Sequence, residues 1–300
     1  MRNSRIVAVH LLNDFSGTSF VFSQALEALQ HDENEIHVFT ANPAGKGFLH
    51  EVTGAFVHTV YYRSSINRLL MALFFIYSQL YIFIRLLFFV RRSDLVYVNT
   101  VQPFGAALAA WMRGCRVVYH VHKVTQRPGI LKHWLLMVVR ITSTKCIYVS
   151  KYLRANSPLK TRSKVIYNSL PLKFIAQAKS YISPVGQPFR VLMLCSLKKA
   201  KGILQFVECA QRLPQLHFDL VISSSQHDID RFFKDRLLPE NLSIFPVQKN
   251  VHPFYASASL VVNLSIPGEF NESFGMTILE AMYYKKPVIV PSVGGVMELV

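Results

Sequence analysis

One long apolar run, LLMALFFIYSQLYIFIRLLFFV at Leu69–Val90, limits the folds open to this chain more than any other segment. A helix of about 20 apolar residues is long enough to cross a bilayer. Ser78, Arg85 and Arg92 recur every seventh residue and so share one helical face, which favours a helix docked at a membrane surface. The strand-like segment Asp94–Asn99 follows closely, and a spanning helix does not lead easily into it. A wholly buried or crossover helix and a spanning helix are the alternatives.

Around this run, short apolar segments alternate with segments of helical periodicity. Ile6–His10 predicts a strand, Phe20–Leu29 a helix, and Glu35–Thr40 the next strand. Such an opening is typical of a doubly wound parallel sheet. Further strands of the first half are predicted at Asp94–Asn99, Arg116–His122, Cys146–Ser150 and Val165–Asn168. No Gly-x-Gly-x-x-Gly follows the first strand, which disfavours a dinucleotide cofactor.

A second sheet is predicted after a linker. The linker is the polar segment Lys173–Pro188, in which Ser183, Pro184 and Gly186 interrupt both periodicities. Strands then follow at Phe189–Leu194, Phe218–Ile222, Ile244–Val247 and Leu260–Asn263. A length of 300 residues suits two domains of ordinary size. We therefore expect an α/β protein with two Rossmann-like domains facing a cleft, at residues 1–175 and 186–300.

The segment Pro267–Met282 has the pattern of a ligand site at a helix N-terminus. Good helix formers begin at Met276, so Glu272 lies on the preceding loop and Glu280 about one turn inside the helix. The unpaired N–H groups and the dipole of a helix N-terminus suit a phosphate, and Gly275 permits close approach. A carboxylate one turn in can accept hydrogen bonds from a ribose diol, and a carboxylate on the loop can reach a sugar. The pattern indicates a site for a nucleotide-activated sugar.

The same region resembles a known family. Glu-x7-Glu enclosing Phe274–Gly275 is followed by Glu280-Ala-Met, Lys286-Pro-Val-Ile-Val-Pro and Gly294–Glu298. The spacing of the two glutamates alone is common by chance, whereas the whole run from Asn263 to Glu298 is specific. It resembles the donor site of the group 1 family of retaining glycosyltransferases, which have the GT-B fold.

This resemblance implies roles for residues of the second domain. Glu280 would hold the ribose and Glu272 the sugar. Phe274, Gly275 and Met276 would line the donor site, and the loop near Val247 would lie close to the nucleobase.

Cys195–Gly202 resembles the family's Gly-Arg-Leu-x-x-x-Lys-Gly segment, in which the lysine holds the donor diphosphate. Lys201 matches that lysine. Ser196 stands where arginine is common, and Lys198 or Lys199 would supply the missing charge. Arginine and lysine are not equivalent phosphate ligands, because only arginine is a planar fork. The alternative for Lys201 is a solvated basic turn.

In the first domain, the resemblance places Gly17 and Thr18 on a loop that binds substrate, with a plain tight turn as the alternative. His122 matches a histidine that meets the donor sugar, at the carboxyl end of a parallel strand where ligands bind in such sheets. His120 shares its face of the strand, because side chains alternate. The alternative for both is a neutral, hydrogen-bonded core histidine.

The net charge of +16 is concentrated in the first half of the chain. From Arg85 to Lys173 there are 16 basic residues and one acid, Asp94. Such a surface attracts phosphate groups, either of nucleic acid or of an anionic membrane. No segment resembles a nucleic-acid-binding motif, so an anionic membrane surface is the expected partner and nucleic acid is not. A second basic, apolar helix predicted at 127–142 would extend this surface.

Neither a metal nor a cofactor other than the donor is expected. The four cysteines are scattered, without Cys-x-x-Cys, which fits a reducing cytosol. Asp228-Ile229-Asp230 has the Asp-x-Asp form of the other glycosyltransferase fold, but it lies at a predicted helix start, where acids are favoured anyway. The N-terminus shows no signal peptide. We expect a cytoplasmic protein at the inner face of the cytoplasmic membrane.

Together these features predict a metal-independent glycosyltransferase, with His122, Lys201 and Glu272 as catalytic residues. It would move a sugar, with retention, from a nucleotide diphosphate sugar to a membrane-associated, lipid-linked saccharide of a cell-surface polysaccharide such as lipopolysaccharide. Family members generally continue for several tens of residues, so the second domain is expected to be incomplete. A soluble sugar-nucleotide epimerase of the same fold and an inactive, membrane-bound nucleotide-binding protein are the alternatives.

Overall fold

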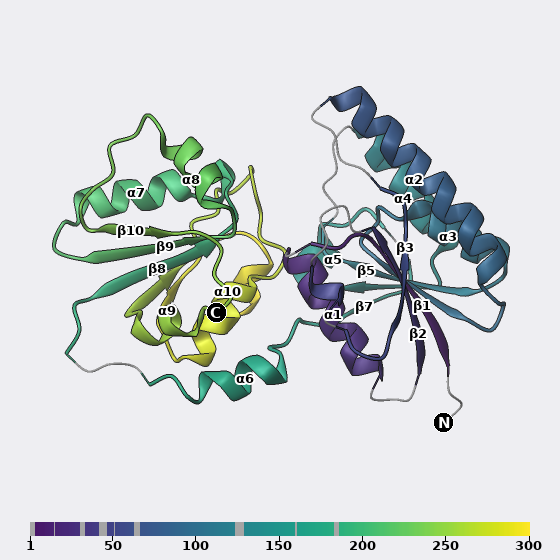
Figure 1. Ribbon diagram of the computed structural model, residues 1–300, viewed down its shortest axis with the longest axis horizontal. Helices are drawn as coiled ribbons and strands as arrows, with labels where there is room; N and C mark the ends of the chain where they lie inside the picture. Colours follow the sequence, from purple (N-terminus) through teal and green to yellow (C-terminus); the bar gives the residue numbers. More distant parts are fainter. Residues whose placement is uncertain are drawn as a thin grey trace. The chain divides into compact units, whose positions relative to one another are not determined.

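The computed structural model describes residues 4–14, 16–30, 34–41, 47–50, 52–62, 67–123, 129–159, 161–182 and 186–300. The chain forms two compact units, the first unit Met1–Tyr167 and the second unit Asn168–Val300. Each is built on one parallel sheet with helices on both faces (Figure 1). The expected α/β class with two Rossmann-like domains is thereby confirmed.

The boundary between the two units, after Tyr167, lies before the predicted linker in the sequence. The predicted linker segment, Lys173–Pro188, contains part of helix α6 (Leu172–Ala178), which belongs to the second unit. Phe174 of this helix packs into the core of the second unit, and this apolar contact explains why the segment folds with it. Ser183 and Pro184 of the predicted linker lie outside the described residues.

The first unit contains a seven-stranded parallel sheet. Its strands are β1 (Arg5–Leu12), β2 (Glu35–Ala41), β3 (Phe56–Thr59), β4 (Leu95–Asn99), β5 (Arg116–Val121), β6 (Lys145–Tyr148) and β7 (Ser163–Val165). The helices are α1 (Gly17–Gln30), the short η1 (Phe48–His50), α2 (Arg68–Phe89), α3 (Phe104–Met112), α4 (Gly129–Thr142) and α5 (Lys151–Ala155). The strand order is β3-β2-β1-β4-β5-β6-β7, so the chain changes direction across the sheet between β1 and β4.

The core of the first unit lies on both faces of this sheet. On one face, Phe22 and Leu26 of α1 pack against Ile6 and Val38 of the neighbouring strands. On the other face, α2, α3 and α4 lie side by side (Figure 1). The predicted helix 127–142 is α4, and Arg127 lies outside the described residues.

The apolar run forms α2, almost as predicted, but its buried face is unexpected. Ser78 and Gln79 are buried against α3, where the Gly105 N–H donates to Gln79 Oε1 at 3.1 Å. A Cβ at position 105 would lie 2.1 Å from the Gln79 carbonyl oxygen, so glycine permits this close crossing. Ser78 is therefore inside while Arg85 is exposed, and the predicted one-sided polar stripe does not form.

The other face of α2 is apolar and exposed. Its exposed side chains include Leu69, Leu73, Ile76, Tyr77, Leu80, Ile84 and Phe88. By length and composition α2 is able to cross a membrane, and only 22% of its most apolar stretch is buried. A soluble core helix of this length is usually mostly buried, whereas α2 is not.

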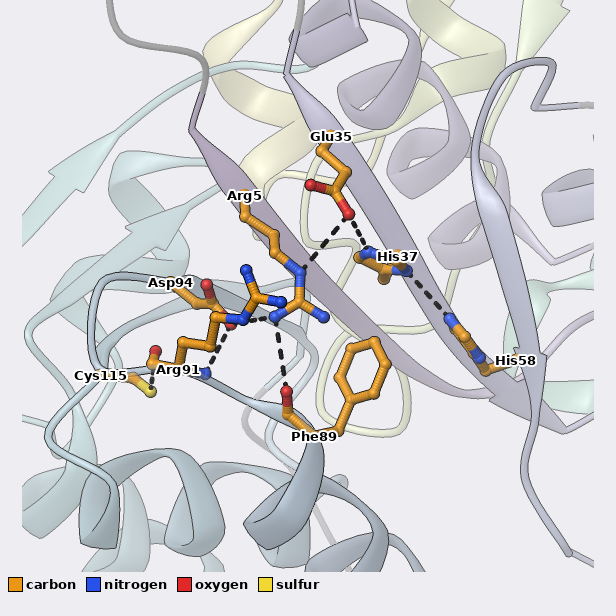
Figure 2. A network of polar contacts seen from close by, with 8 residues as sticks. All are labelled: Arg5, Glu35, His37, His58, Phe89, Arg91, Asp94 and Cys115. Carbon is orange, nitrogen blue, oxygen red and sulfur yellow. Dashed lines mark hydrogen bonds and ion pairs between the residues drawn. The ribbon is translucent and has the colours of Figure 1, made fainter.

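A polar cluster fixes the end of α2 to the amino edge of the sheet (Figure 2). Arg5 donates to Asp94 Oδ2 at 2.9 Å and to the Phe89 carbonyl oxygen at 3.4 Å. Its guanidinium also lies 4.4 Å from the centroid of the Phe89 ring. Asp94 is 1% exposed and accepts a further hydrogen bond from the Arg91 N–H, at 2.8 Å. Glu35, His37 and His58 continue the cluster across β2 and β3.

The second unit contains a five-stranded parallel sheet. Its strands are β8 (Arg190–Cys195), β9 (His217–Ile222), β10 (Leu242–Phe245), β11 (Leu260–Val262) and β12 (Val288–Ile289). Besides α6, its helices are η2 (Lys199–Lys201), α7 (Ile203–Arg212), α8 (Gln226–Phe233), α9 (His252–Ser257), α10 (Met276–Tyr283) and η3 (Gly295–Glu298). The strand order is β10-β9-β8-β11-β12. Helices α7 and α8 cover one face, and α9 and α10 cover the other (Figure 1).

Candidate functional site

The candidate site of the second unit lies where its chain changes direction across the sheet. From β8 the chain proceeds to β9 and β10 on one side, and then to β11 on the other side of β8. Ligands of open parallel sheets bind at such a switch point, outside the carboxyl ends of the strands. The segment after β8 carries Lys201, and the segment after β11 carries Glu272.

A glycine brings these two segments together. Gly202 has φ +78°, and a Cβ there would lie 2.0 Å from the Leu264 carbonyl oxygen. Nearby, the Ile266 N–H donates to the Ala200 carbonyl oxygen at 3.0 Å. The turn after β8 is therefore packed directly against the segment after β11, and this contact positions Lys201.

Lys201 and Glu272 form an ion pair through Nζ and Oε1. The same carboxylate oxygen accepts hydrogen bonds from Asn263 Nδ2 and Ser265 Oγ, each at 3.2 Å. Lys201 Nζ also lies 3.8 Å from the centroid of the Phe270 ring. The two charged side chains are only 13% and 14% exposed, and opposite charge compensates the desolvation of each.

The glycine-rich segment near the end of the chain holds the Glu272 backbone. Glu272 and Gly294 form a parallel β-bridge, and the Gly295 N–H donates to the Glu272 carbonyl oxygen at 2.6 Å. Gly294 has φ +122°, and a Cβ there would lie 2.8 Å from that oxygen. The Gly294–Glu298 motif thus has a structural role beside the carboxylate that the sequence singled out.

The helix predicted after Gly275 is α10, and it begins at Met276. Gly275 has φ +103°, and a Cβ there would lie 2.7 Å from Val296 Cγ2. Among the described residues, no side chain caps this helix. The first N–H groups and the dipole of such a helix favour an anion nearby.

Glu280 lies one turn inside α10, as predicted. Its Oε2 accepts a hydrogen bond from the Tyr255 hydroxyl at 2.6 Å. Burial raises the pKa of Glu280 to about 7, and the hydrogen bond from Tyr255 opposes this rise. Glu280 therefore changes charge near neutral pH.

The remaining predicted residues of the second unit differ in exposure. Phe274 is 4% exposed, so its side chain belongs to the interior, and its place in the donor site stays a prediction. Met276 is half-buried at the start of α10. Val247 is exposed at the same edge of the sheet, after β10, and its N–H donates to the Ser224 carbonyl oxygen at 3.0 Å.

The sequence did not single out Tyr255, Ser265 or Phe270. It also did not identify Asn263 as a hydrogen-bond donor to Glu272. Asn263 and Ser265 follow directly after β11, and polar residues at the end of a buried parallel strand are the signal that indicates them. Nothing in the sequence places Tyr255 of α9 beside Glu280.

In the first unit, His122 lies at the carboxyl edge of the sheet but does not open to solvent. It is 6% exposed, and its Nε2 lies 2.8 Å from Asn99 Oδ1. Burial lowers the pKa of His122 well below its usual value, and His120 and His10 lower it further. The burial and the contact with Asn99 fit the alternative of a neutral, hydrogen-bonded core histidine, and contact of His122 with the donor sugar stays a prediction.

His120 shares the face of His122, as predicted, and the ring centroids lie 4.1 Å apart. The Tyr97 hydroxyl lies 2.8 Å from His120 Nδ1. Burial lowers the pKa of His120 to about 4, so its ring is neutral at physiological pH.

The predicted loop residues Gly17 and Thr18 lie at the start of α1. The Thr18 carbonyl oxygen accepts from Asn99 Nδ2 at 3.3 Å, which joins this loop to the partner of His122. A Cβ at Gly17 would meet no atom within 4 Å, so the position does not require glycine. The structure thus brings Thr18 and His122 together through Asn99, which the sequence did not single out.

No group of three or more His, Cys, Asp or Glu side chains among the described residues is arranged to hold a metal ion. Asp228 of the Asp-x-Asp segment lies in the first turn of α8, and its carboxylate accepts from the Ser225 hydroxyl at 2.6 Å.

Solved structures with this fold include several glycosyltransferases. Anabaena HepE in complex with UDP-glucose is 19% identical, with a TM-score of 0.74, over 99% of this chain and 82% of that chain. The catalytic domain of Arabidopsis thaliana starch synthase IV, bound to ADP and acarbose, is 14% identical, with a TM-score of 0.71, over 99% and 85%. WaaG, a glycosyltransferase involved in lipopolysaccharide biosynthesis, is 17% identical, with a TM-score of 0.68, over 98% and 83%. These likenesses show the GT-B fold.

A search of curated protein sequences finds no match. Two protein families together match nearly the whole chain. Residues 15–174 match the family described as Glycosyltransferase Family 4, and residues 178–300 match Glycosyl transferases group 1. The first match alone extends over more than half of the chain. The protein therefore belongs to the glycosyltransferases of family 4, with a second half of the group 1 type.

Proposed function

We propose that this glycosyltransferase moves a sugar, with retention, from a nucleotide diphosphate sugar to a saccharide acceptor. The observation that carries the proposal is the Lys201–Glu272 ion pair at the switch point of the second sheet. It places a cation and a carboxylate, both largely shielded from water, in the unit that also contains the uncapped start of α10 and Glu280.

Each group has a proposed role in donor binding. The Lys201 ammonium and the N-terminus of α10 stabilise the charge that develops on the leaving diphosphate. The Glu280 carboxylate accepts hydrogen bonds from the ribose hydroxyls, and Glu272 accepts them from the sugar. In this scheme the lysine and the helix N-terminus hold the diphosphate charge, and the transfer requires no metal ion. His122 serves the transfer as a neutral imidazole.

The solved complexes support a nucleotide-sugar donor. HepE holds UDP-glucose and starch synthase IV holds ADP, and both have the fold of this chain. WaaG, with the same fold, acts in lipopolysaccharide biosynthesis, which supports a cell-surface polysaccharide as the product.

We further propose a lipid-linked acceptor and a peripheral position at the cytoplasmic face of the membrane. The support is a docking face, formed by the exposed apolar side chains of α2, α3 and α4. Besides those of α2, they are Trp111, Met112, Ile130, Trp134, Met137 and Ile141. Arg85, Arg113 and Arg140 are exposed on the same three-helix layer and would meet anionic headgroups.

The anchored end of α2 favours docking over spanning. To span a bilayer, α2 would have to leave the sheet, which would break the contacts of Arg5 with Asp94 and Phe89 (Figure 2). It would also expose Gln79, now bonded to Gly105, to hydrocarbon.

A thermal-shift screen with UDP, GDP, ADP and TDP and their sugars tests the donor site. A ligand at about 100 times its Kd stabilises the folded protein by about 2.7 kcal/mol, which raises Tm by a few degrees. One nucleotide series should stabilise the wild type and not the Glu280→Ala variant. The control variant Glu208→Ala, at an exposed position of α7, should respond like the wild type. If no nucleotide shifts Tm, the donor site is disproved. A shift without turnover on any saccharide acceptor would instead indicate a nucleotide-binding protein that is not a transferase.

Vesicle sedimentation tests the docking face. The protein should pellet with anionic vesicles, be released by high salt, and pellet poorly with neutral vesicles. Ile84→Glu and Phe88→Glu should abolish pelleting, whereas Leu237→Glu, at a still more exposed apolar residue of the second unit, should not. Pelleting that resists salt and alkali and yields only to detergent would show spanning.

A further inference from the structure

A continuous chain of hydrogen bonds crosses the carboxyl edge of the first sheet. It starts at Asp14, whose Oδ1 lies 2.6 Å from Ser19 Oγ, and Ser19 Oγ lies 3.0 Å from His10 Nε2. It continues from His10 Nδ1 to Asn99 Nδ2, at 3.1 Å, and from Asn99 Oδ1 to His122 Nε2, at 2.8 Å. The chain joins the loop after β1 to the residue that follows β5.

Donor and acceptor chemistry permits one direction along this chain. A carboxylate accepts and does not donate, so the Ser19 hydroxyl donates to Asp14. The Ser19 oxygen then accepts from the Nε2–H of His10. The Nδ1 of this neutral ring therefore keeps its lone pair and accepts from the Asn99 amide. The amide oxygen of Asn99 in turn accepts from the Nε2–H of His122, which leaves Nδ1 of His122 without a proton.

Two further contacts agree with this direction. Asn99 Nδ2 also lies 3.3 Å from the Thr18 carbonyl oxygen, which only a donor can approach, so the amide is oriented independently of the histidines. Ser16 Oγ lies 2.6 Å from the same oxygen of Asp14 and donates to it as well. Asp14 is thus the acceptor at which donors of this loop converge.

Burial keeps both imidazoles neutral, as the direction requires. His10 and His122 are each 6% exposed, and Asn99 is fully buried. Burial lowers the pKa of His10 to about 4 and that of His122 well below its usual value. The other titratable groups that face the two rings are Asp14, already in the chain, and His120, which is itself neutral.

We propose that Asp14 is a positioning residue for His122, acting through Ser19, His10 and Asn99. It fixes the His122 tautomer that carries its proton on Nε2 and offers Nδ1 as a hydrogen-bond acceptor. A substrate group that meets this ring at Nδ1 must therefore bring the hydrogen, as a sugar hydroxyl does. The inference rests on the proposed function only in that His122 serves the transfer.

Long-range ¹H–¹⁵N NMR of histidine-labelled full-length protein tests the tautomers directly, because ring nitrogens with and without a proton differ widely in shift. In the wild type, His10 and His122 should both carry the proton on Nε2. Asp14→Ala and Ser19→Ala should each give mixed tautomers at His10 and His122. Ser16→Ala is the matched control. Ser16 donates to the same oxygen of Asp14 and lies 3.3 Å from Ser19 Oγ, but it is not a link between Asp14 and His122, so this variant should keep the wild-type pattern.

Two results would overturn the proposal. One is a proton on Nδ1 of His10 or His122 in the wild type. The other is an unchanged single tautomer at His122 in both Asp14→Ala and Ser19→Ala. Ser19→Ala removes one buried hydroxyl and keeps the charge of Asp14, so it tests the chain even where Asp14→Ala does not fold.

Turnover provides a separate reading. With a wrong tautomer, kcat should fall about 10- to 100-fold in Asp14→Ala and Ser19→Ala, with the donor KM little changed, and stay near wild type in Ser16→Ala. If the NMR pattern holds while no nucleotide sugar binds, the tautomer assignment stands and the proposed function fails. If nucleotide sugars bind and turn over while the NMR pattern differs from the expected one, the proposed function stands and the tautomer assignment fails.

Discussion

The carboxyl edges of the two sheets share a topology and differ in their charges. At both, the chain changes direction beside the central strand, and at both, polar side chains are largely removed from water. The second unit holds ions there: Lys201 paired with Glu272, and Glu280 with a pKa near neutrality. The first holds two neutral imidazoles and an amide, in a chain of hydrogen bonds that ends at the Asp14 carboxylate. Buried polar groups must be compensated: the second edge does this by pairing opposite charges, and the first by hydrogen bonds between groups that, apart from Asp14, are neutral.

The difference agrees with the proposed division of labour between the units. An edge that holds a cation beside a helix N-terminus suits a charged diphosphate. An edge of neutral donors and acceptors suits uncharged hydroxyl groups, whose hydrogen bonds need direction rather than charge. Each of the following predictions changes one of the two edges and leaves the other intact.

The largest effect is expected from removing the cation of the second edge. Lys201→Met keeps much of the apolar stem and deletes the charge that stabilises the leaving diphosphate. Loss of one such preorganised group lowers kcat about 100- to 1,000-fold, measured with saturating nucleotide sugar. Lys234→Ala, at an exposed lysine of the same unit that ends α8, should change kcat far less. Equal losses in both variants would mean that diffuse positive charge, and not Lys201, serves the reaction.

The same substitution should also destabilise the second unit. It leaves the Glu272 carboxylate, 14% exposed, without its counter-ion, and breaking a buried pair in this way costs about 3 kcal/mol. The double variant Lys201→Met with Glu272→Gln should regain most of that loss, because the neutral amide needs no cation. Urea unfolding measures both. Additive losses in the double variant would show that the two side chains are not energetically coupled.

The ion pair between Lys201 and Glu272 could not be predicted from the sequence. The resemblance singled out both residues, because each belongs to a short contiguous motif. The two are 71 positions apart, however, and their contact depends on the close approach at Gly202. The hydrogen-bond chain of the first unit is similar: His10 and Asn99 are 89 positions apart, and the parallel register of β1 with β4 brings them together.

The apolar helix shows another limit. The length of the apolar run predicted its extent, Leu69–Val90 against the observed Arg68–Phe89, because nearly every residue is a good helix former or apolar. It did not predict the buried face, because a helix that is apolar almost all round has little amphipathic signal. The close crossing at Gly105 determines which face of α2 is buried, and it turns Ser78 and Gln79 inward.

Acid should affect the two edges in opposite directions. The pKa of His10 is about 4 in the folded state and 6.5 as the ordinary value, so the unfolded chain takes up the proton first as pH falls. The first unit therefore has its full stability above pH 6.5 and loses it toward pH 4. The pKa of Glu280 is about 7 folded against 4.5, so the folded state takes up that proton first. The second unit gains stability from Glu280 as pH falls from 7 to 4.5.

At pH 5 the loss from His10 and the gain from Glu280 each change the free energy of unfolding by about 2 kcal/mol. Urea titrations at pH 7.5 and pH 5, each followed by a hydrogen-exchange pulse at one fixed pH and mass spectrometry, resolve peptides of the two units. His10→Gln should reduce the acid loss in the first unit, and Glu280→Gln should remove the acid gain in the second. If both variants shift stability with the same sign, the contrast between a neutral and a charged edge is wrong.

The smallest effect is expected from Tyr255, which influences the fraction of Glu280 that is ionised at neutral pH. The Tyr255 hydroxyl donates to Glu280 Oε2 at 2.6 Å and lowers the pKa of that carboxyl, opposing burial. Tyr255→Phe keeps the buried ring and deletes the donor, so the pKa of Glu280 should rise. At pH 7 fewer molecules would carry the ionised carboxylate that accepts from ribose. A rise of about half a pKa unit from about 7 would lower the ionised fraction, and with it the nucleotide affinity, about twofold. The loss should disappear at pH 9, where Glu280 is ionised in both proteins, whereas Glu280→Gln should bind weakly at either pH. A loss that persists unchanged at pH 9 would mean that Tyr255 supports the site by packing and not by tuning the charge of Glu280.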